Sequence, residues 1–279
     1  MPIIDTKGIE PFADLMKEIY GDLAKPGVTQ IGIALATVIG LLNTCLSPIK
    51  FLNTKTELNR QKNLDKLAER FSEIPQEEIL EAPPEIAVPI AEKLVYVSNE
   101  ELRDMYIELL AKASTKSLNE NAHPSFVNII NNLCPDEALI IKILFSKADI
   151  PFIEVNLIDI NDDTFININP YLTEFEMDSN LIFKNNSASY LSNLTGLGII
   201  HIRHEYVVID ENTYESLEKY TSKLYEDYLS ELDEMESQTY ADKELELKRS
   251  KFDITPFGQL FINAVSHQMI DITEDHPQT

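Results

Sequence analysis

Residues 28–46 read VTQIGIALATVIGLLNTCL, and the interpretation of this stretch decides how the rest of the chain is organised. No charged residue occurs between Lys25 and Lys50. A helix that crosses a bilayer needs about 20 apolar residues at roughly 1.5 Å each, so the stretch reaches the lower limit of that length. Polar residues such as Gln30 and Asn43 dilute it. A helix that inserts into a membrane and a helix buried in the protein core are therefore both open interpretations.

Small residues recur within this stretch at a spacing of four. On a helix, Gly32, Ala36 and Gly40 would form one smooth stripe that lets a second helix approach closely. Large aliphatic side chains flank the stripe, among them Ile31, Leu35 and Ile39. We predict that these six residues form a membrane or oligomer helix, and we expect a homo-oligomer. The alternative is a core helix that packs within its own domain.

A run of basic residues follows directly. Residues 50–70 hold six bases and three acids, in a chain with 47 acidic and 23 basic residues and a net charge of −24. Bases beside an inserted helix contact anionic lipid headgroups and contribute up to about 1 kcal/mol each. We expect anionic-lipid contact from Lys50, Lys55, Arg60 and Lys62. The competing interpretation is a solvated helix that docks on its own protein. The negative net charge opposes binding to a phosphate backbone, so no nucleic-acid partner is expected.

The composition favours two modest domains over one large domain. We predict an N-terminal helical region at 1–73 with an apolar helix at 28–46 and a basic helix at 48–72, a Pro-rich linker with a short helix at 74–97, an α+β body at 98–272 and a flexible tail at 273–279. Cys45 and Cys134 show neither disulfide nor metal spacing, which suits a reducing cytosol. We expect a cytoplasmic protein, associated with the inner membrane if the apolar helix inserts.

The chain after residue 74 alternates turn signals with short periodic segments. A helix is expected after Pro89, and Ser98 with Glu101 predicts a capping box for the next helix. Prolines at 124 and 135 predict helices at 124–131 and 135–145. β-Branched and aromatic residues from 151 to 169 predict a hairpin that turns at 161–163.

The last third adds more helices and strands. We predict a short helix at 187–194, strands at 198–203 and 206–209, a long charged helical segment at 213–251, a strand at 252–255 and a final helix from Pro256. A break of the long segment near Gln238 is left open. This order is that of a winged-helix domain with a long helical insertion in its wing. The predicted fold class is mainly α with a small β component (α+β). The candidate recognition helix, SASYLSNLTG, has no Lys or Arg, so we expect it to contact protein and not DNA.

The sequence contains no motif that indicates catalysis or a cofactor. With 8 glycines, the chain shows no phosphate-binding loop, no nucleophile elbow and no Cys–His pair at motif spacing. His201 and His204 would point to different sides of a strand and its turn, which is poor geometry for a metal. His123 precedes Pro124 and is expected to cap a helix. We predict no catalytic residue, no metal, no cofactor and no enzymatic activity.

Three segments resemble the abortive infection alpha (Abi-alpha) family of bacterial proteins. They are IPQEEILEAPPEIAVPIAEKL at 74–94, ELRDMYIELLAKAS followed by HPSFVNIINNLCPDEALIIKIL within 101–144, and ITPFGQLFINAVS at 254–266. The middle segment is the most specific, because a helix, an HPSF turn and a PDEA helix start follow in fixed order. The resemblance covers about residues 50–267 and implies a bacterial protein associated with phage defence. It transfers no functional residues and no enzymatic activity.

Two hypotheses follow for the function. The first is a non-enzymatic antiphage protein that acts at the membrane through the apolar helix at 28–46. The second is a soluble winged-helix interaction module or regulator that binds a phage or host protein. A DNA-binding regulator is the least favoured interpretation, for the reasons of charge given above.

Overall fold

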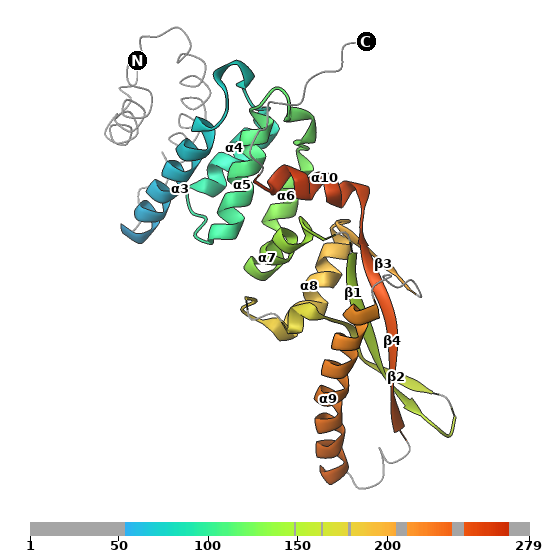
Figure 1. The fold of residues 1–279 in the computed structure, drawn as a ribbon. Helices are drawn as coiled ribbons and strands as arrows, with labels where there is room; N and C mark the ends of the chain where they lie inside the picture. The colour runs from blue at the N-terminus through green and yellow to red at the C-terminus, as the bar shows by residue number, and fades with distance from the viewer. Residues whose placement is uncertain are drawn as a thin grey trace, which may run out of the picture. The chain divides into compact units, whose positions relative to one another are not determined.

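The computed structural model describes residues 54–147, 149–162, 164–177, 180–204, 211–235 and 243–267. The chain divides into two compact units. The first, here called the helical unit, comprises residues up to Pro135 and those from Asn263 onward. The second, the mixed unit, comprises residues 136–262. Figure 1 shows the elements of both, which are described separately below.

The helical unit is built around α5 (Glu100–Ala113). Three helices pack on α5 or on each other beside it: α3 (Thr54–Ser72), α4 (Pro84–Leu94) and α6 (Ser125–Asn131). Short 3-10 turns lie between them, η2 (Gln76–Glu78) and η3 (Asn119–Asn121). Their facing side chains are fully buried, including Leu67, Phe71, Ile86, Leu110 and Phe126. The basic helix predicted after residue 48 therefore docks on its own protein from Thr54 onward, through a face that carries Leu67 and Phe71.

Two predictions about helix starts in this unit were wrong. The helix expected after Pro89 begins at Pro84, because a proline in the first turn has no hydrogen bond to lose. Pro89 lies inside α4, where burial of Ile86 and Ile90 offsets the cost of a missing backbone hydrogen bond. The cap of α5 is Asn99, whose side-chain oxygen accepts the Leu102 N–H at 3.0 Å, and not the predicted Ser98.

The mixed unit combines helices with one four-stranded antiparallel sheet. The chain is therefore an α+β protein in the residues described. The strands follow the order β2-β1-β4-β3 across the sheet. In chain order the elements are α7 (Pro135–Leu144), β1 (Asp149–Asp159), β2 (Phe165–Thr173), η4 (Glu174–Glu176), η5 (Lys184–Asn186), α8 (Ser187–Gly196), β3 (Ile200–Arg203), α9 (Glu211–Met235), β4 (Lys243–Ile254) and α10 (Pro256–Val265). The hairpin of β1 and β2, the helix at α8 and the start of the last helix at Pro256 are confirmed.

The long helix predicted at 213–251 is wrong in its second half. Helix α9 ends at Met235, and residues from Lys243 form β4, which pairs with the whole of β1 from Asp149↔Asp253 to Asp159↔Lys243. Glu, Lys and Leu favour helices intrinsically, but long-range pairing overrides that preference here. The stretch from 243 alternates, so that Leu245 and Leu247 pack on one face of the sheet. The predicted strand at 206–209 and the predicted tail lie outside the described residues.

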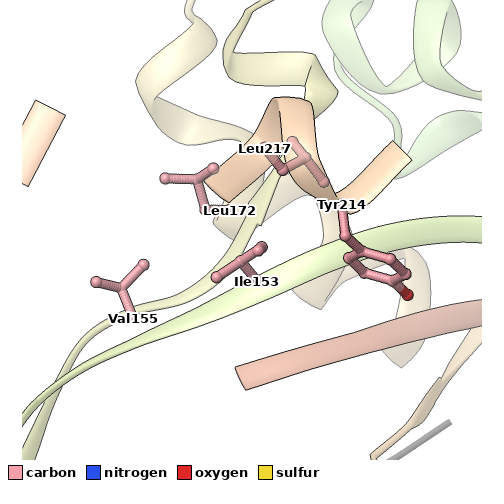
Figure 2. Packing of buried hydrophobic residues seen from close by; sticks show 5 residues of the cluster. All are labelled: Ile153, Val155, Leu172, Tyr214 and Leu217. Atoms are coloured by element: carbon pink, nitrogen blue, oxygen red, sulfur yellow. The ribbon is translucent and has the colours of Figure 1, made fainter. Parts of the chain in front are cut away.

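Helix α9 covers one face of the sheet. Figure 2 shows the core between them, where Tyr214 and Leu217 of α9 meet Ile153 and Val155 of β1 and Leu172 of β2. The hydroxyl of Tyr214 donates to the carbonyl oxygen of Ser250 at 2.8 Å, so this large side chain buries its polar end with a partner.

The start of α10 is fixed by a Thr-Pro-x-Gly sequence. The Thr255 hydroxyl accepts the Gly258 N–H at 2.8 Å and donates to the carbonyl oxygen of Gly198 at 2.6 Å. A Cβ on Gly258 would lie 2.0 Å from the carbonyl oxygen of Ile199, so the helix can approach β3 this closely only with glycine there. Threonine caps the helix and proline opens it, as the sequence indicates.

Candidate functional site

The residues predicted to meet a membrane are only partly within the described chain. The six residues of the small-residue stripe and its flanks, and Lys50, lie outside the described residues. Lys55 belongs to α3. The side chain of Arg60 is buried, 7% exposed, so it faces the protein and not a membrane, whereas Lys62 is exposed. Across the described ranges, no helix has both the length and the apolar character to cross a bilayer.

The histidines singled out in the sequence have structural partners. His123 Nδ1 accepts a hydrogen bond from the backbone N–H of Ser125, the first residue of α6, at 3.2 Å, although the N-cap position itself is Pro124. His201 lies 3.8 Å from Asp253, and His204 lies 2.9 Å from Glu154. Within the part of the chain that the structure describes, no group of three or more His, Cys, Asp or Glu residues is placed to hold a metal ion.

A buried carboxylate at the start of α7 is the centre of the candidate site. Asp136 belongs to the PDEA segment and is only 1% exposed. Its Oδ1 accepts the backbone N–H of Ile182 at 2.8 Å, and its Oδ2 accepts the backbone N–H of Phe183 at 2.9 Å. Oδ2 also accepts the hydroxyl of Tyr190 from α8 at 2.9 Å. Asp136 therefore fixes two consecutive backbone groups of the loop before α8.

The side chains on this fixed backbone point to solvent. Ile182 is 65% exposed and Phe183 is 63% exposed, although both are large and apolar. We call these two residues the apolar pair. Hydrogen bonds to a carboxylate are about twice as strong as neutral ones, so the loop that carries the apolar pair is held firmly. The result is a preorganised apolar surface on a defined backbone.

A second, half-buried carboxylate anchors the same segment from its other end. Glu176 of η4 accepts the backbone N–H of Thr173 at 2.9 Å and is hydrogen-bonded to the hydroxyl of Ser187, the first residue of α8. Burial raises the pKa of Glu176, and these hydrogen bonds act in the opposite direction. The side chain of Glu137, next to Asp136, accepts a hydrogen bond from the side-chain amide of Asn193 in α8 at 2.8 Å. Helix α8 and the loop before it are thus tied to α7 and η4 through three carboxylates.

A cleft lies next to this segment in the mixed unit. Its volume is about 570 Å³. An ion pair between Lys147 and Glu174 lies in its wall. The other lining residues are mostly apolar, with two hydroxyls from the start of α9: Ile143, Phe175, Met177, Thr213, Ser216 and Leu217. Because Met177 is 44% exposed, the apolar lining of the cleft continues onto the surface at η4.

The helical unit holds a separate cluster of buried charges. Glu108 of α5 is 5% exposed, and its Oε1 accepts Arg70 Nε at 2.8 Å and lies 2.8 Å from His267 Nδ1. One turn later, Lys112 is 2% exposed and donates to the carbonyl oxygens of Ser266, at 2.7 Å, and Asn263. Burial lowers the pKa of Lys112 to about 8. These contacts attach the end of α10 and the residues that follow it, Ser266 and His267, to α5. The role of the cluster is therefore structural.

Sequence reasoning missed the roles of Asp136, Glu176 and Glu108. Acids in the first turn of a helix are common on solvated surfaces, so Asp136 carried no signal of burial. The fixed order of the PDEA segment was the only indication that its acids matter. Their partners lie 46 or more residues away in the sequence for Asp136 and 38 away for Glu108, which local patterns cannot reveal.

Comparisons with known proteins give one match. A family model described as abortive infection alpha matches residues 59–265, from within α3 to the last residue of α10. The matched range includes Asp136, Glu176 and the apolar pair. No curated protein and no solved structure matches the chain.

Proposed function

The chain belongs to the abortive infection alpha family, and from this premise we propose that it is a non-enzymatic protein of antiphage defence that binds a phage or host protein through its mixed unit. The proposed binding surface is the apolar pair, Ile182 and Phe183. We propose a cytoplasmic location for this activity. The observation that carries the proposal is the exposure of two large apolar side chains on a backbone that a buried carboxylate holds.

The energetics of this arrangement support a binding role. When a partner covers large exposed apolar side chains, the binding free energy becomes more favourable by about 25 cal/mol for each Å² of apolar surface removed from water. A loop that is already ordered loses less conformational entropy on binding. Asp136 supplies that order, because it satisfies both backbone N–H groups of the apolar pair. An aromatic anchor beside an aliphatic one is typical of the residues that dominate protein interfaces.

The charge around α8 supports a protein partner over a nucleic acid. From residue 181 to 203 the only basic residues are Lys184 and Arg203, and Arg203 is paired with Asp253 at 2.9 Å. DNA readers need several bases on the helix that enters the groove and on the wing. Helix α8 is followed by β3, α9 and β4, and β3 pairs with β4; this order supports a winged-helix interpretation, to which the chain adds β1 and β2 between α7 and α8. A winged helix without bases is suited to protein contact.

Phage challenge tests the proposal. Bacteria that express the chain are compared with bacteria that express the double variant Ile182→Ser, Phe183→Ser, by plating efficiency over a phage panel. The double variant should fold, because both side chains are exposed, and should lose protection. The matched control is Leu224→Ser, which removes an exposed apolar side chain from α9 and should retain protection. Full protection by the double variant would remove the apolar pair from the function.

The uncharged stretch at 28–46 favours action at a membrane as the second candidate function. In that case the helix inserts into anionic lipid and associates through Gly32, Ala36 and Gly40, which also accounts for a homo-oligomer. Leakage from dye-loaded anionic liposomes, lost in Gly40→Leu, is the expected result. Absence of leakage together with fully soluble fractionation would rule this route out. Two of the six bases in the run at 50–70, Arg60 and Arg70, are buried and so cannot contact lipid in this structure.

A further inference from the structure

Strand β2 forms one edge of the sheet, with β1 on one side and no strand on the other in the described part of the chain. The backbone N–H of Asp159 donates to the carbonyl oxygen of Thr164 at 2.8 Å, so the β1 and β2 sides of the hairpin are hydrogen-bonded at that position. In an antiparallel ladder such pairs alternate with positions whose backbone groups face the other way. The N–H and C=O groups of Phe165 and Asn167 therefore face the open side of the sheet.

This edge lacks the usual protection against a further strand. Native edge strands are commonly guarded by Lys, by Pro or by bulges. The sequence of β2, FININPYLT, contains no charged residue, although 25% of the chain is charged. Pro170 and the irregular pairing opposite Ile153 and Val155 protect only its second half. Residues 165–169 present an open, uncharged edge.

The open edge also carries exposed apolar side chains. Phe165 is 60% exposed and Ile166 is 56% exposed, and they lie on opposite faces of the strand. Ile160, in the turn that leads to β2, is 53% exposed. An added strand would cover apolar surface on both faces as it pairs with the backbone. Main-chain pairing of this kind supplies affinity, and the alternate side chains supply specificity.

The charge of the hairpin indicates the chemistry of the incoming strand. Residues 149–173 include five acids and no Lys or Arg. Asp162 is exposed in the turn, and hydrogen bonds from Thr164 lower its pKa, so it is ionised at neutral pH. Lys248 of β4 lies over the ring of Phe165 but is paired with Glu246 at 2.9 Å. Lys243 of β4 faces Asp159 and also lowers the pKa of Asp162. The hairpin itself carries only acids, so its own charge favours a basic partner.

We propose that the edge formed by residues 165–169 accepts an extended segment of a partner protein, one that alternates apolar residues and carries Lys or Arg beside the acidic turn. A second copy of this chain fits less well, because each copy has a net charge of −24 and its own hairpin contains no base to offset the acids. This site is separate from the apolar pair, and it stands whether or not the apolar pair binds a partner.

A peptide-binding experiment with the full chain tests this proposal. The probe is the fluorescent peptide Lys-Lys-Ile-Thr-Ile-Thr-Ile-Lys-Lys, and its matched control has Glu at each Lys position. Fluorescence anisotropy should show binding of the Lys peptide at least about tenfold tighter than the Glu peptide. Phe165→Pro removes the outward N–H and should weaken binding about tenfold or more. Phe165→Thr keeps the N–H and should weaken binding less than Phe165→Pro does.

A second variant covers the case in which Phe165→Pro fails to fold. Ile166→Lys places a positive charge on the edge and should repel the Lys peptide, whereas Ile166→Thr should not. No binding of the Lys peptide, equal binding of the two peptides, or unchanged binding by both Phe165→Pro and Ile166→Lys would overturn the proposal. A dimer in sedimentation that Phe165→Pro dissociates would also overturn it, because the edge would then be occupied by a second copy.

Discussion

Replacement of Asp136 by alanine should release the loop that carries the apolar pair. The carboxylate accepts three hydrogen bonds, from the backbone of Ile182, the backbone of Phe183 and the hydroxyl of Tyr190. A buried donor that loses its partner costs about 1–3 kcal/mol. Water can replace part of the loss, since the loop lies at the surface. We therefore expect the free energy of unfolding to fall by about 3 kcal/mol in Asp136→Ala.

Two measurements check this value. Urea unfolding gives the free energy of unfolding of the parent and the variant. Hydrogen exchange gives the protection of the two loop amides, and a loss of about 3 kcal/mol corresponds to exchange roughly 100-fold faster. Asp136→Asn retains one acceptor oxygen and should show a smaller loss on both measures. Glu81→Ala serves as the control, because Glu81 is exposed and its loss should change stability by less than about 0.5 kcal/mol.

The reasoning would be refuted if Asp136→Ala unfolded within about 0.5 kcal/mol of the parent. It would also be refuted if the amides of Ile182 and Phe183 exchanged at the parental rate, because a different group would then hold the loop.

Three further changes probe the packing and charge of the two units. Gly258→Ala places a Cβ 2.0 Å from the carbonyl oxygen of Ile199 and should lower the free energy of unfolding, measured in urea, by about 3 kcal/mol. The control is Gly196→Ala, whose Cβ meets no atom within 4 Å and should be tolerated. Leu217→Ala empties part of the core under α9 and should cost about 2–5 kcal/mol in the same assay. The pKa of Lys112 is about 8 when folded against 10.5 ordinarily, so the unfolded chain binds this proton more tightly, and the Lys112 contribution to the free energy of unfolding should rise as the pH increases from about 8 to about 10.5. Lys112→Met should abolish that rise, and an unchanged pH profile in this variant would contradict the assignment.

Local signals in the sequence predicted the elements whose boundaries depend on their own residues. The hairpin of β1 and β2 followed from alternation around a polar turn, and α10 followed from Pro256 at its start. The start of α7 at Pro135 followed in the same way. The basic helix was left open between a membrane surface and its own protein, and the structure shows it docked from Thr54 onward through Leu67 and Phe71.

Long-range pairing was beyond local signals. Residues 243–254 are rich in helix formers, and pairing with β1, about 90 residues earlier, and with β3 makes them a strand. The same holds for the candidate site, since Asp136 meets its partners 46 to 54 residues later. An acid in the first turn of a helix suggests solvent exposure from the sequence alone, and its burial depends on a loop whose position the sequence does not indicate.

The central claim is that the apolar pair, held by Asp136, is the surface through which this protein binds a partner in phage-infected cells. Replacement of Phe183 by the photo-crosslinking residue benzoylphenylalanine tests it most directly. Illumination of infected cells should attach one phage or host protein to position 183, and the attachment should be lost when Asp136→Ala is added. Absence of any protein attached at position 183, or attachment that persists in Asp136→Ala, would contradict the account.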